Sequence, residues 1–194
     1  IIMKKIFCLL ILVNVAFAQQ GLNLEELDKS SSGIMMYPYS GKTFETWPNG
    51  DLKVRGRLRN GLRNGKWEYY HTNGSKMASG KYFDGNGSKI DSETKVSMHG
   101  FVGNWTFYYK TGQQWQEGSW KDGIPTGEHV KWYPNGNTKT ILTYEDGGLE
   151  GPITKWFEDG QVKEEAFYYS GKLDSSYSTW YSNGSKKEEG DYER

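Results

Sequence analysis

The stretch GKWEYYHTNG, residues 65–74, decides the fold, because close variants of it recur along the chain. A second copy, GNWTFYYKTG, occupies residues 103–112. The last glycine of the stretch recurs at positions 50, 74, 112, 136, 160 and 184, so four of the five intervals are 24 residues and the fifth is 38. The long interval equals one period plus 14 inserted residues. A fixed period of this length predicts a repeat architecture in which each unit is one supersecondary element.

Each unit has the pattern of a β-hairpin. Asn-Gly or Asp-Gly between short aromatic-rich runs favours a two-residue type I′ turn, in which both central residues have positive φ. Glycines recur too often for a helix. The sequence therefore predicts an all-β fold over residues 39–194, an elongated single-layer antiparallel meander of about six stacked β-hairpin repeats of 24 residues. About twelve short strands are expected, with an insertion at about residues 86–102.

A two-residue turn also predicts which side chains face each other. The position seven before the turn glycine should pair with the position six after it. This rule pairs a ring with a glycine in Trp67–Gly80, Trp105–Gly118 and Tyr177–Gly190, whereas His129 pairs with Leu142 and Ile153 pairs with Ala166. Large ring and glycine therefore occur together. We interpret this as a ring that lies over its facing glycine.

An aromatic residue stands four places before the turn glycine in five units, on the face of the sheet opposite the expected core. These residues are the candidate binding site and are called the stripe: Tyr70, Tyr108, Trp132, Trp156 and Trp180. The same register places Lys139, Lys163 and Lys187 opposite the three tryptophans. Packing of each ring on a lysine, with cation–π attraction, is the alternative that needs no ligand.

The insertion offers little recognisable chemistry. Asp84, Asp91 and Glu93 lack the spacing of an EF-hand calcium loop. An ordinary solvated loop is the favoured interpretation, and because added loop length costs little closure entropy, the insertion is predicted to be the most dispensable part of the repeat region.

The first 18 residues have the pattern of a secretory signal peptide. Met3-Lys4-Lys5 precedes an apolar run at 6–13, and Ala16-Phe17-Ala18 resembles a cleavage site. An uncleaved N-terminal anchor is the alternative. Residues 19–38 would be a linker or cap. The protein is therefore expected to be exported, to a periplasmic, cell-surface or extracellular location, and the mature chain has no second apolar run long enough to span a bilayer.

No motif in the chain predicts catalysis, a metal or a cofactor. His71 and His129 occupy repeat positions where other units carry rings, and His99 lies in the insertion without an evident partner. The 24 basic and 24 acidic residues balance, so charge gives no reason to expect a nucleic-acid partner. The prediction is a protein that is not an enzyme.

Residues 65–74 and 103–112, with their relatives over 39–194, resemble the MORN repeat and most closely its bacterial variant, often labelled as a YwqK-type antitoxin. This resemblance implies an elongated sheet of stacked hairpins that serves as an interaction or scaffold module. The predicted function is an exported non-enzymatic protein-binding or scaffold protein. The alternatives are a glycan or envelope-polymer binder that uses the stripe, and a toxin-neutralising or immunity protein, which rests on the family label alone. The oligomeric state stays open.

Overall fold

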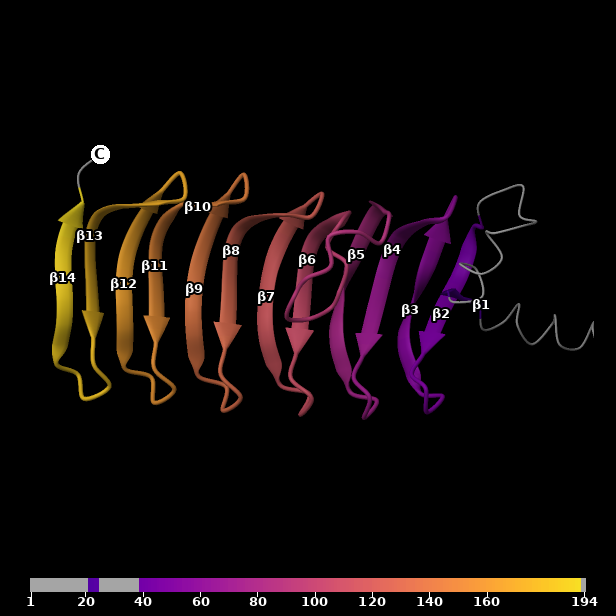
Figure 1. Ribbon diagram of the computed structural model, residues 1–194, viewed down its shortest axis with the longest axis horizontal. Coiled ribbons are helices and arrows are strands. Elements are labelled where there is room, and N and C mark those ends of the chain that lie inside the picture. Colours follow the sequence, from indigo (N-terminus) through magenta and orange to yellow (C-terminus); the bar gives the residue numbers. More distant parts are fainter. Residues whose placement is uncertain (1–20, 25–38, 193–194) are drawn as a thin grey trace, which may run out of the picture.

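A computed structural model describes residues 21–24 and 39–192 as a single open β-sheet. Figure 1 shows the strands side by side in one layer, in chain order along the long axis of the molecule. The 14 strands are β1 (Leu22–Asn23), β2 (Gly41–Thr46), β3 (Leu52–Arg59), β4 (Leu62–Tyr70), β5 (Lys76–Gly85), β6 (Phe101–Tyr108), β7 (Gln114–Lys121), β8 (Ile124–Trp132), β9 (Thr138–Glu145), β10 (Gly148–Leu149), β11 (Gly151–Trp156), β12 (Val162–Tyr169), β13 (Lys172–Trp180) and β14 (Lys186–Tyr192).

The predicted fold class is confirmed. Neighbouring strands pair antiparallel, with one exception, the parallel pair β1–β2. The two-residue strand β10 lies off the main path and pairs with β9. The signal peptide predicted for residues 1–18 lies outside the described residues, as does most of the linker predicted for 19–38. Within residues 21–24 and 39–192, no helix has the length and apolar character needed to cross a membrane.

The type I′ turns lie at the other ends of the strands from those predicted. At Asn60-Gly61, both φ angles are positive, 50° and 78°, and Arg59 pairs directly with Leu62. The same two-residue turn joins the units at Asp122-Gly123, Asp146-Gly147 and Ser170-Gly171. At Asn135-Gly136, in contrast, only the glycine has positive φ. The prediction of type I′ turns at the 24-residue glycines is therefore wrong.

Those glycines instead close a three-residue loop. The Gly136 amide donates to the Tyr133 carbonyl, and the Tyr133 amide donates to the carbonyl of Asn137. This is a type I turn followed by a left-handed glycine, which suits Pro134 at the second position. The additional loop residue is compensated by a bulge, since Trp132 pairs with Thr138 whereas Lys131 pairs with Thr140. Beyond the bulge, all five predicted cross-strand pairs are present, the three of a ring with a glycine and the two without.

At Gly56, Gly80 and Gly118 the covering ring comes from the next unit, whereas Gly190 is covered by Tyr177 of its own predicted pair. A Cβ built on Gly80 would overlap the Trp105 ring, and one on Gly56 would overlap the Trp67 ring. His129 takes the same place over Gly118. The interpretation that each ring lies over its own paired glycine is therefore wrong for these units. The reason is a bulge between units, where β4 has two more residues than β3 between Arg55–Glu68 and Arg57–Asn64, which shifts each ring across the neighbouring strand.

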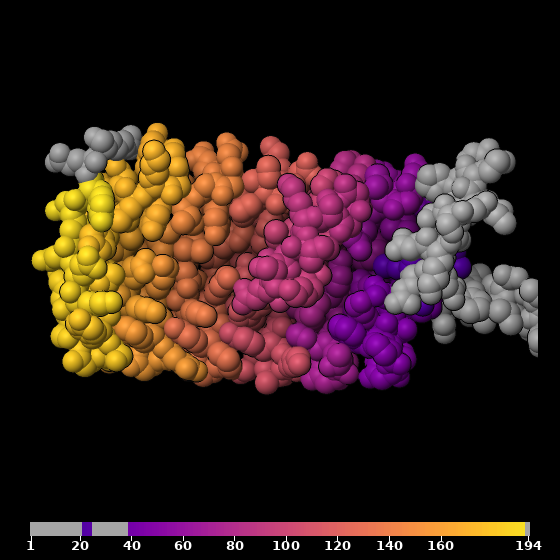
Figure 2. Space-filling view, viewed as in Figure 1, coloured from indigo at the N-terminus to yellow at the C-terminus, as the bar shows by residue number. Residues whose placement is uncertain are grey.

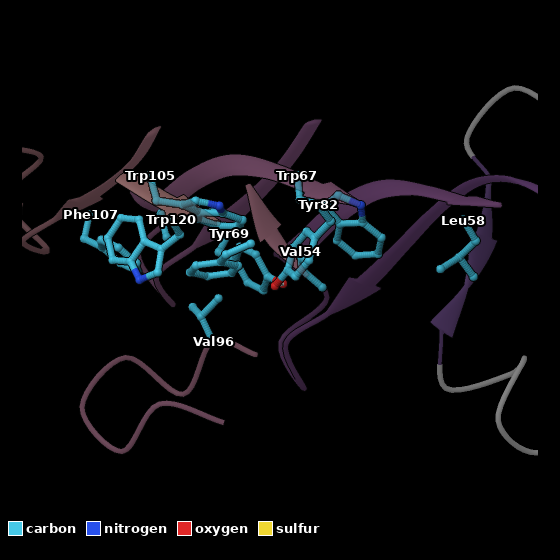
Figure 3. Packing of buried hydrophobic residues seen from close by; sticks show 11 residues of the cluster. Val54, Leu58, Trp67, Tyr69, Tyr82, Val96, Trp105, Phe107 and Trp120 are labelled. Carbon is cyan, nitrogen blue, oxygen red and sulfur yellow. The ribbon is translucent and has the colours of Figure 1, made fainter. Parts of the chain in front are cut away.

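The buried core is confined to one face and to the N-terminal half of the sheet. We call the face that carries Trp67, Tyr82 and Trp105 the core face, and the opposite one the stripe face. The core cluster is aromatic, and Figure 3 shows its rings packed side by side. Phe101 stacks on Trp105 with ring centroids 3.6 Å apart, and the Tyr82 ring stands edge-on to Trp105 at 5.0 Å. Aromatic rings thus supply the burial that aliphatic side chains supply in most cores.

The insertion is part of this core. Because β6 begins at Phe101, the inserted segment comprises residues 86–100, and Figures 1 and 2 show it lying across the face of the sheet over β5 and β6. Val96 is 0% exposed and faces the rings in Figure 3. The Tyr82 hydroxyl donates to the Ser97 carbonyl. The interpretation of the insertion as a solvated loop is therefore wrong, because its middle supplies a second layer over the rings.

Candidate functional site

The five stripe residues occupy equivalent places in the sheet. Each is the last residue of its strand, in β4, β6, β8, β11 and β13. These strands alternate with the others along the sheet, so neighbouring stripe positions lie two strand spacings apart, roughly 10 Å. All five side chains are half-buried. The structure thus aligns Tyr70, Tyr108, Trp132, Trp156 and Trp180 in one row near the three-residue loops, but it does not bring their rings into contact within the described residues.

The lysines predicted to cover the stripe point elsewhere. Because of the bulge beside each loop, Lys139 is not paired with Trp132, and its Nζ lies 5.4 Å from the centroid of the Tyr133 ring. Lys163 and Lys187 lie over Phe157 and Tyr181 in the same way, at 5.6 and 5.8 Å. Within residues 39–192, no cation–π contact involves Trp132, Trp156 or Trp180. The predicted pairing of these tryptophans with lysines is therefore wrong, and the alternative that relied on it loses its basis.

A ladder of hydrogen bonds holds successive stripe positions at a fixed spacing. A ring three places before the turn glycine reaches the main chain of the next hairpin in several units. The Trp47 indole donates to the Tyr70 carbonyl at 3.2 Å, and the Tyr109 and Tyr133 hydroxyls donate to the Trp132 and Trp156 carbonyls at 2.7 and 2.8 Å. The His71 ring makes the equivalent bond to the Tyr108 carbonyl at 3.0 Å. Phe157 has no polar group to continue the ladder. His71 therefore has the role of a ring at this position, as predicted.

Charge on the stripe face gathers at one end of the row. Glu68 accepts hydrogen bonds from Arg55 and Lys76, and the Tyr70 hydroxyl donates to it at 3.2 Å. Burial acts to raise the pKa of Glu68, but the bonds from Arg55, Lys66 and Lys76 outweigh it and lower the pKa to about 2. Glu68 is therefore a fixed anion that neutralises nearby cations. The N-terminal end of the stripe is thus more polar than its tryptophan end.

A cleft opens on the other face of the sheet, between the insertion and the core face. Its volume is about 560 Å³, and side chains from every strand from β2 to β7 contribute to its wall. The apolar part of the wall includes Trp47, Val54, Met77, Ile90 and Trp115. This volume lies in the range of ligand-binding pockets. Sequence reasoning missed the cleft because nothing in the repeat pattern shows that the insertion folds back over the sheet.

One cation in the cleft has no polar partner. The Nε and Nη1 atoms of Arg63 are buried without a hydrogen-bond partner. The guanidinium carbon lies 5.2 Å from the Trp67 ring centroid and 5.7 Å from that of Tyr82. Arg63 follows no repeat pattern, so sequence reasoning did not single it out. In the structure, Arg55 and Arg59 of β3 form ion pairs with Glu68 and Asp84.

His129 and Asp91 are titratable residues whose contacts support the fold. The His129 ring is buried over Gly118 and bonds to the Ser119 carbonyl at 2.9 Å, and burial lowers its pKa. Asp91 Oδ1 accepts from the amides of Glu93 and Thr94 and so caps a turn of the insertion. Over the described ranges, no three His, Cys, Asp or Glu side chains are placed to hold a metal ion.

Part of the hairpin repeat matches a known protein family. Three consecutive segments match one family description, at residues 101–122, 125–146 and 149–170. They match the MORN repeat variant. The first two MORN segments begin at or beside the first residue of β6 and β8, and the third begins at Leu149 of β10, two residues before β11. Each segment ends in the turn to the next unit, so it corresponds to one hairpin of the sheet. These matches support a MORN-repeat protein, as the sequence predicted.

Other comparisons add little to the MORN match. No curated protein matches the chain in sequence. A solved structure titled "Crystal structure of GtfA/B complex bound to UDP and GlcNAc" aligns over 80% of this chain and 25% of that chain, at 12% identity and a TM-score of 0.23. The chain thus spans about a quarter of that relative. A TM-score this low carries no argument about fold or function.

Proposed function

We propose that the protein is an exported, non-enzymatic binding module whose stripe holds an extended segment of a partner protein. The observation that carries the proposal is the row of five half-buried rings, aligned at the ends of alternate strands and free of the lysines expected to cover its tryptophans. Half-buried Trp and Tyr side chains are frequent anchors in protein interfaces because they bury much area at low entropic cost.

The MORN match is consistent with this function, since such repeats are generally associated with protein or membrane binding. A regular row suits a partner that is itself extended. Ring positions repeat at roughly 10 Å, about three residues of an extended chain. Export rests on the N-terminal sequence pattern alone, which lies outside the described residues.

The test combines capture with a matched control. The variant W132T/W156T/W180T should fold, because Thr is well accepted in strands, and it should lose capture of the partner from an envelope extract. The control F83T/F167T/Y169T removes three exposed rings that are not in the stripe, at 59%, 38% and 44% exposure, and should keep the partner. Capture that survives in the folded stripe variant would contradict the proposal.

A glycan is the second candidate, because rings without covering lysines can stack on sugar faces. A polysaccharide array probed with the wild type and both variants separates the two. Binding to a glycan that is lost only in the stripe variant would favour the glycan. A protein that the wild type captures from the extract and the stripe variant does not would favour a protein partner, provided that its capture survives enzymatic deglycosylation.

A further inference from the structure

We propose that the cleft between the insertion and the core face binds a peptide segment that carries a carboxylate next to apolar side chains, with Arg63 as the anchor of the carboxylate. The cleft lies under the insertion, and Tyr108 is the one stripe residue that lines it. The stripe tryptophans Trp132, Trp156 and Trp180 do not line it, so this proposal does not depend on the function proposed for them.

Arg63 lies in the wall of the cleft. Its Nε and Nη1 atoms are buried and have no hydrogen-bond partner, and no ion pair within residues 39–192 includes it. The rings of Trp67 and Tyr82, at 5.2 and 5.7 Å, offer cation–π attraction to the charge. They do not satisfy the N–H donors. A buried charged donor without an acceptor is costly, so this site favours an anion that accepts from it.

The cleft is lined by more basic than acidic side chains. Its wall contains four cationic side chains and two carboxylates. Glu45 pairs with Lys53, and Glu93 lies 3.9 Å from Lys131. Lys95 donates to the Ser92 carbonyl at 2.7 Å. The fourth cation, Lys110, is exposed to solvent. Arg63 is therefore the cation of the cleft whose buried N–H donors lack an acceptor, and a carboxylate fits such donors.

Apart from its charged groups, the wall of the cleft spans several strands and includes apolar side chains. Strands β2 to β7 all contribute to it, so the cleft runs across the strands for roughly 20 Å. Trp47, Met77 and Trp115 give it apolar surface along this length, and Ile90 of the insertion is 57% exposed above it. An elongated apolar cleft with one anionic subsite fits an extended peptide with an acidic group beside apolar residues better than it fits a compact ion.

The insertion closes the cleft beside the anchor. Gly87, with φ of 85°, passes so close to Arg63 that a Cβ at this position would lie 3.0 Å from Nη1. Val96 and Ser97 hold the insertion on the core. The site therefore exists because the insertion folds back over the sheet and approaches Arg63 of β4, and units without an insertion have no counterpart to it.

The experiment uses an array of short synthetic peptides, each containing Asp or Glu beside apolar residues and each paired with the same peptide carrying Asn or Gln. The full chain should bind a subset of the acidic peptides about tenfold more tightly than their amide counterparts. In R63M this preference should disappear, whereas R63K should retain part of it. The control R57M removes an exposed arginine from the neighbouring strand and should bind as the wild type does.

Three results would overturn the proposal: no acidic peptide bound above background, equal binding of acid and amide forms, or an unchanged preference in folded R63M. If R63M does not fold, the Nε–H resonance of Arg63 in the wild type replaces it. This resonance should shift on addition of a selected peptide. An Nε–H that is already hydrogen-bonded before any peptide is added would mean that the chain itself supplies the acceptor, which would also overturn the proposal.

Discussion

The two halves of the sheet are built from the same repeat, yet only one has a layered core. Between β3 and β7, eleven buried hydrophobic residues form one cluster, to which the insertion contributes Val96. Beyond β8, within residues 133–192, only Ile153 and Ala166 are buried hydrophobic residues. Tyr177 is half-buried, and Tyr192 is 49% exposed. The comparison indicates that a repeat hairpin alone makes a sheet, whereas a single insertion turns part of that sheet into a core with a cleft.

Removing the insertion should have the largest effect on this difference. Deletion of residues 87–100 restores the 24-residue period but uncovers rings such as Trp105 and Phe101, both 0% exposed. We expect a loss on the order of 5 kcal/mol, because several large side chains each lose burial worth about 1.5–3 kcal/mol. Chemical denaturation measures the loss, and tryptophan emission should shift to longer wavelength. A deletion variant as stable as the wild type would show that the insertion is a dispensable loop after all.

Crowding a covered glycine should have the next largest effect. Gly80→Ala places a Cβ inside the Trp105 ring, which is fully buried and has nowhere to move. The expected cost is about 3 kcal/mol. Gly190→Ala is the matched change in the C-terminal half, where the Cβ meets Tyr177 Cε1 at 2.7 Å. That half-buried ring can rotate away, so the cost should stay below about 1 kcal/mol. Thermal unfolding compares them, and equal shifts would contradict the difference between the halves.

Acid should weaken the N-terminal half through Glu68. Its pKa is lowered to about 2 in the folded protein, so its contribution is fully present above the unfolded pKa near 4.5 and is lost as pH falls toward 2. Glu68→Gln should therefore cost about 1–3 kcal/mol at neutral pH. The difference in melting temperature between the wild type and Glu68→Gln should narrow steadily as pH falls from 5 toward 2, and it should become small only near pH 2. A gap independent of pH would show that the ion pairs of Glu68 contribute nothing.

The smallest effect should come from one serine in the C-terminal half. Ser175 has φ of 60°, at the position where Gly103 and Gly127 have 65° and 67°. A side chain in this left-handed conformation is unfavourable, so Ser175→Gly should stabilise the protein by about 0.5 kcal/mol after the added freedom of the unfolded chain is subtracted. The reverse change, Gly103→Ser, should destabilise it by a similar amount. A higher melting temperature for Gly103→Ser would contradict the assignment.

The repeat pattern predicted the sheet and its register, because strict periodicity of Trp67, Trp105 and the small residues leaves few alternatives. It failed at the turns. Asn135-Gly136 fits both a type I′ turn and a type I turn with a glycine bulge, and the choice moves Lys139 to the other face. The choice depends on hydrogen bonds that the loop makes with its neighbours, such as that from Asn135 to the Glu158 carbonyl.

The stripe could be predicted from the sequence to a greater extent than the cleft. The stripe is periodic, so its row of rings was predictable, although the absence of covering lysines was not. The cleft depends on the insertion, which occurs once and therefore has no internal repeat to compare with. The apolar residues Ile90, Val96 and Met98 in an otherwise polar segment were the available signal that the insertion packs against the sheet.

The central claim is that the insertion gives the N-terminal half its core, and amide hydrogen exchange of the full chain tests it most directly. Amides of β4 to β6 should exchange far more slowly than those of β12 to β14, because exchange follows local opening and opening is rarest in a layered core. In the variant that lacks residues 87–100, this difference should disappear. Equal protection of the two halves in the wild type, or a difference that survives the deletion, would contradict the claim.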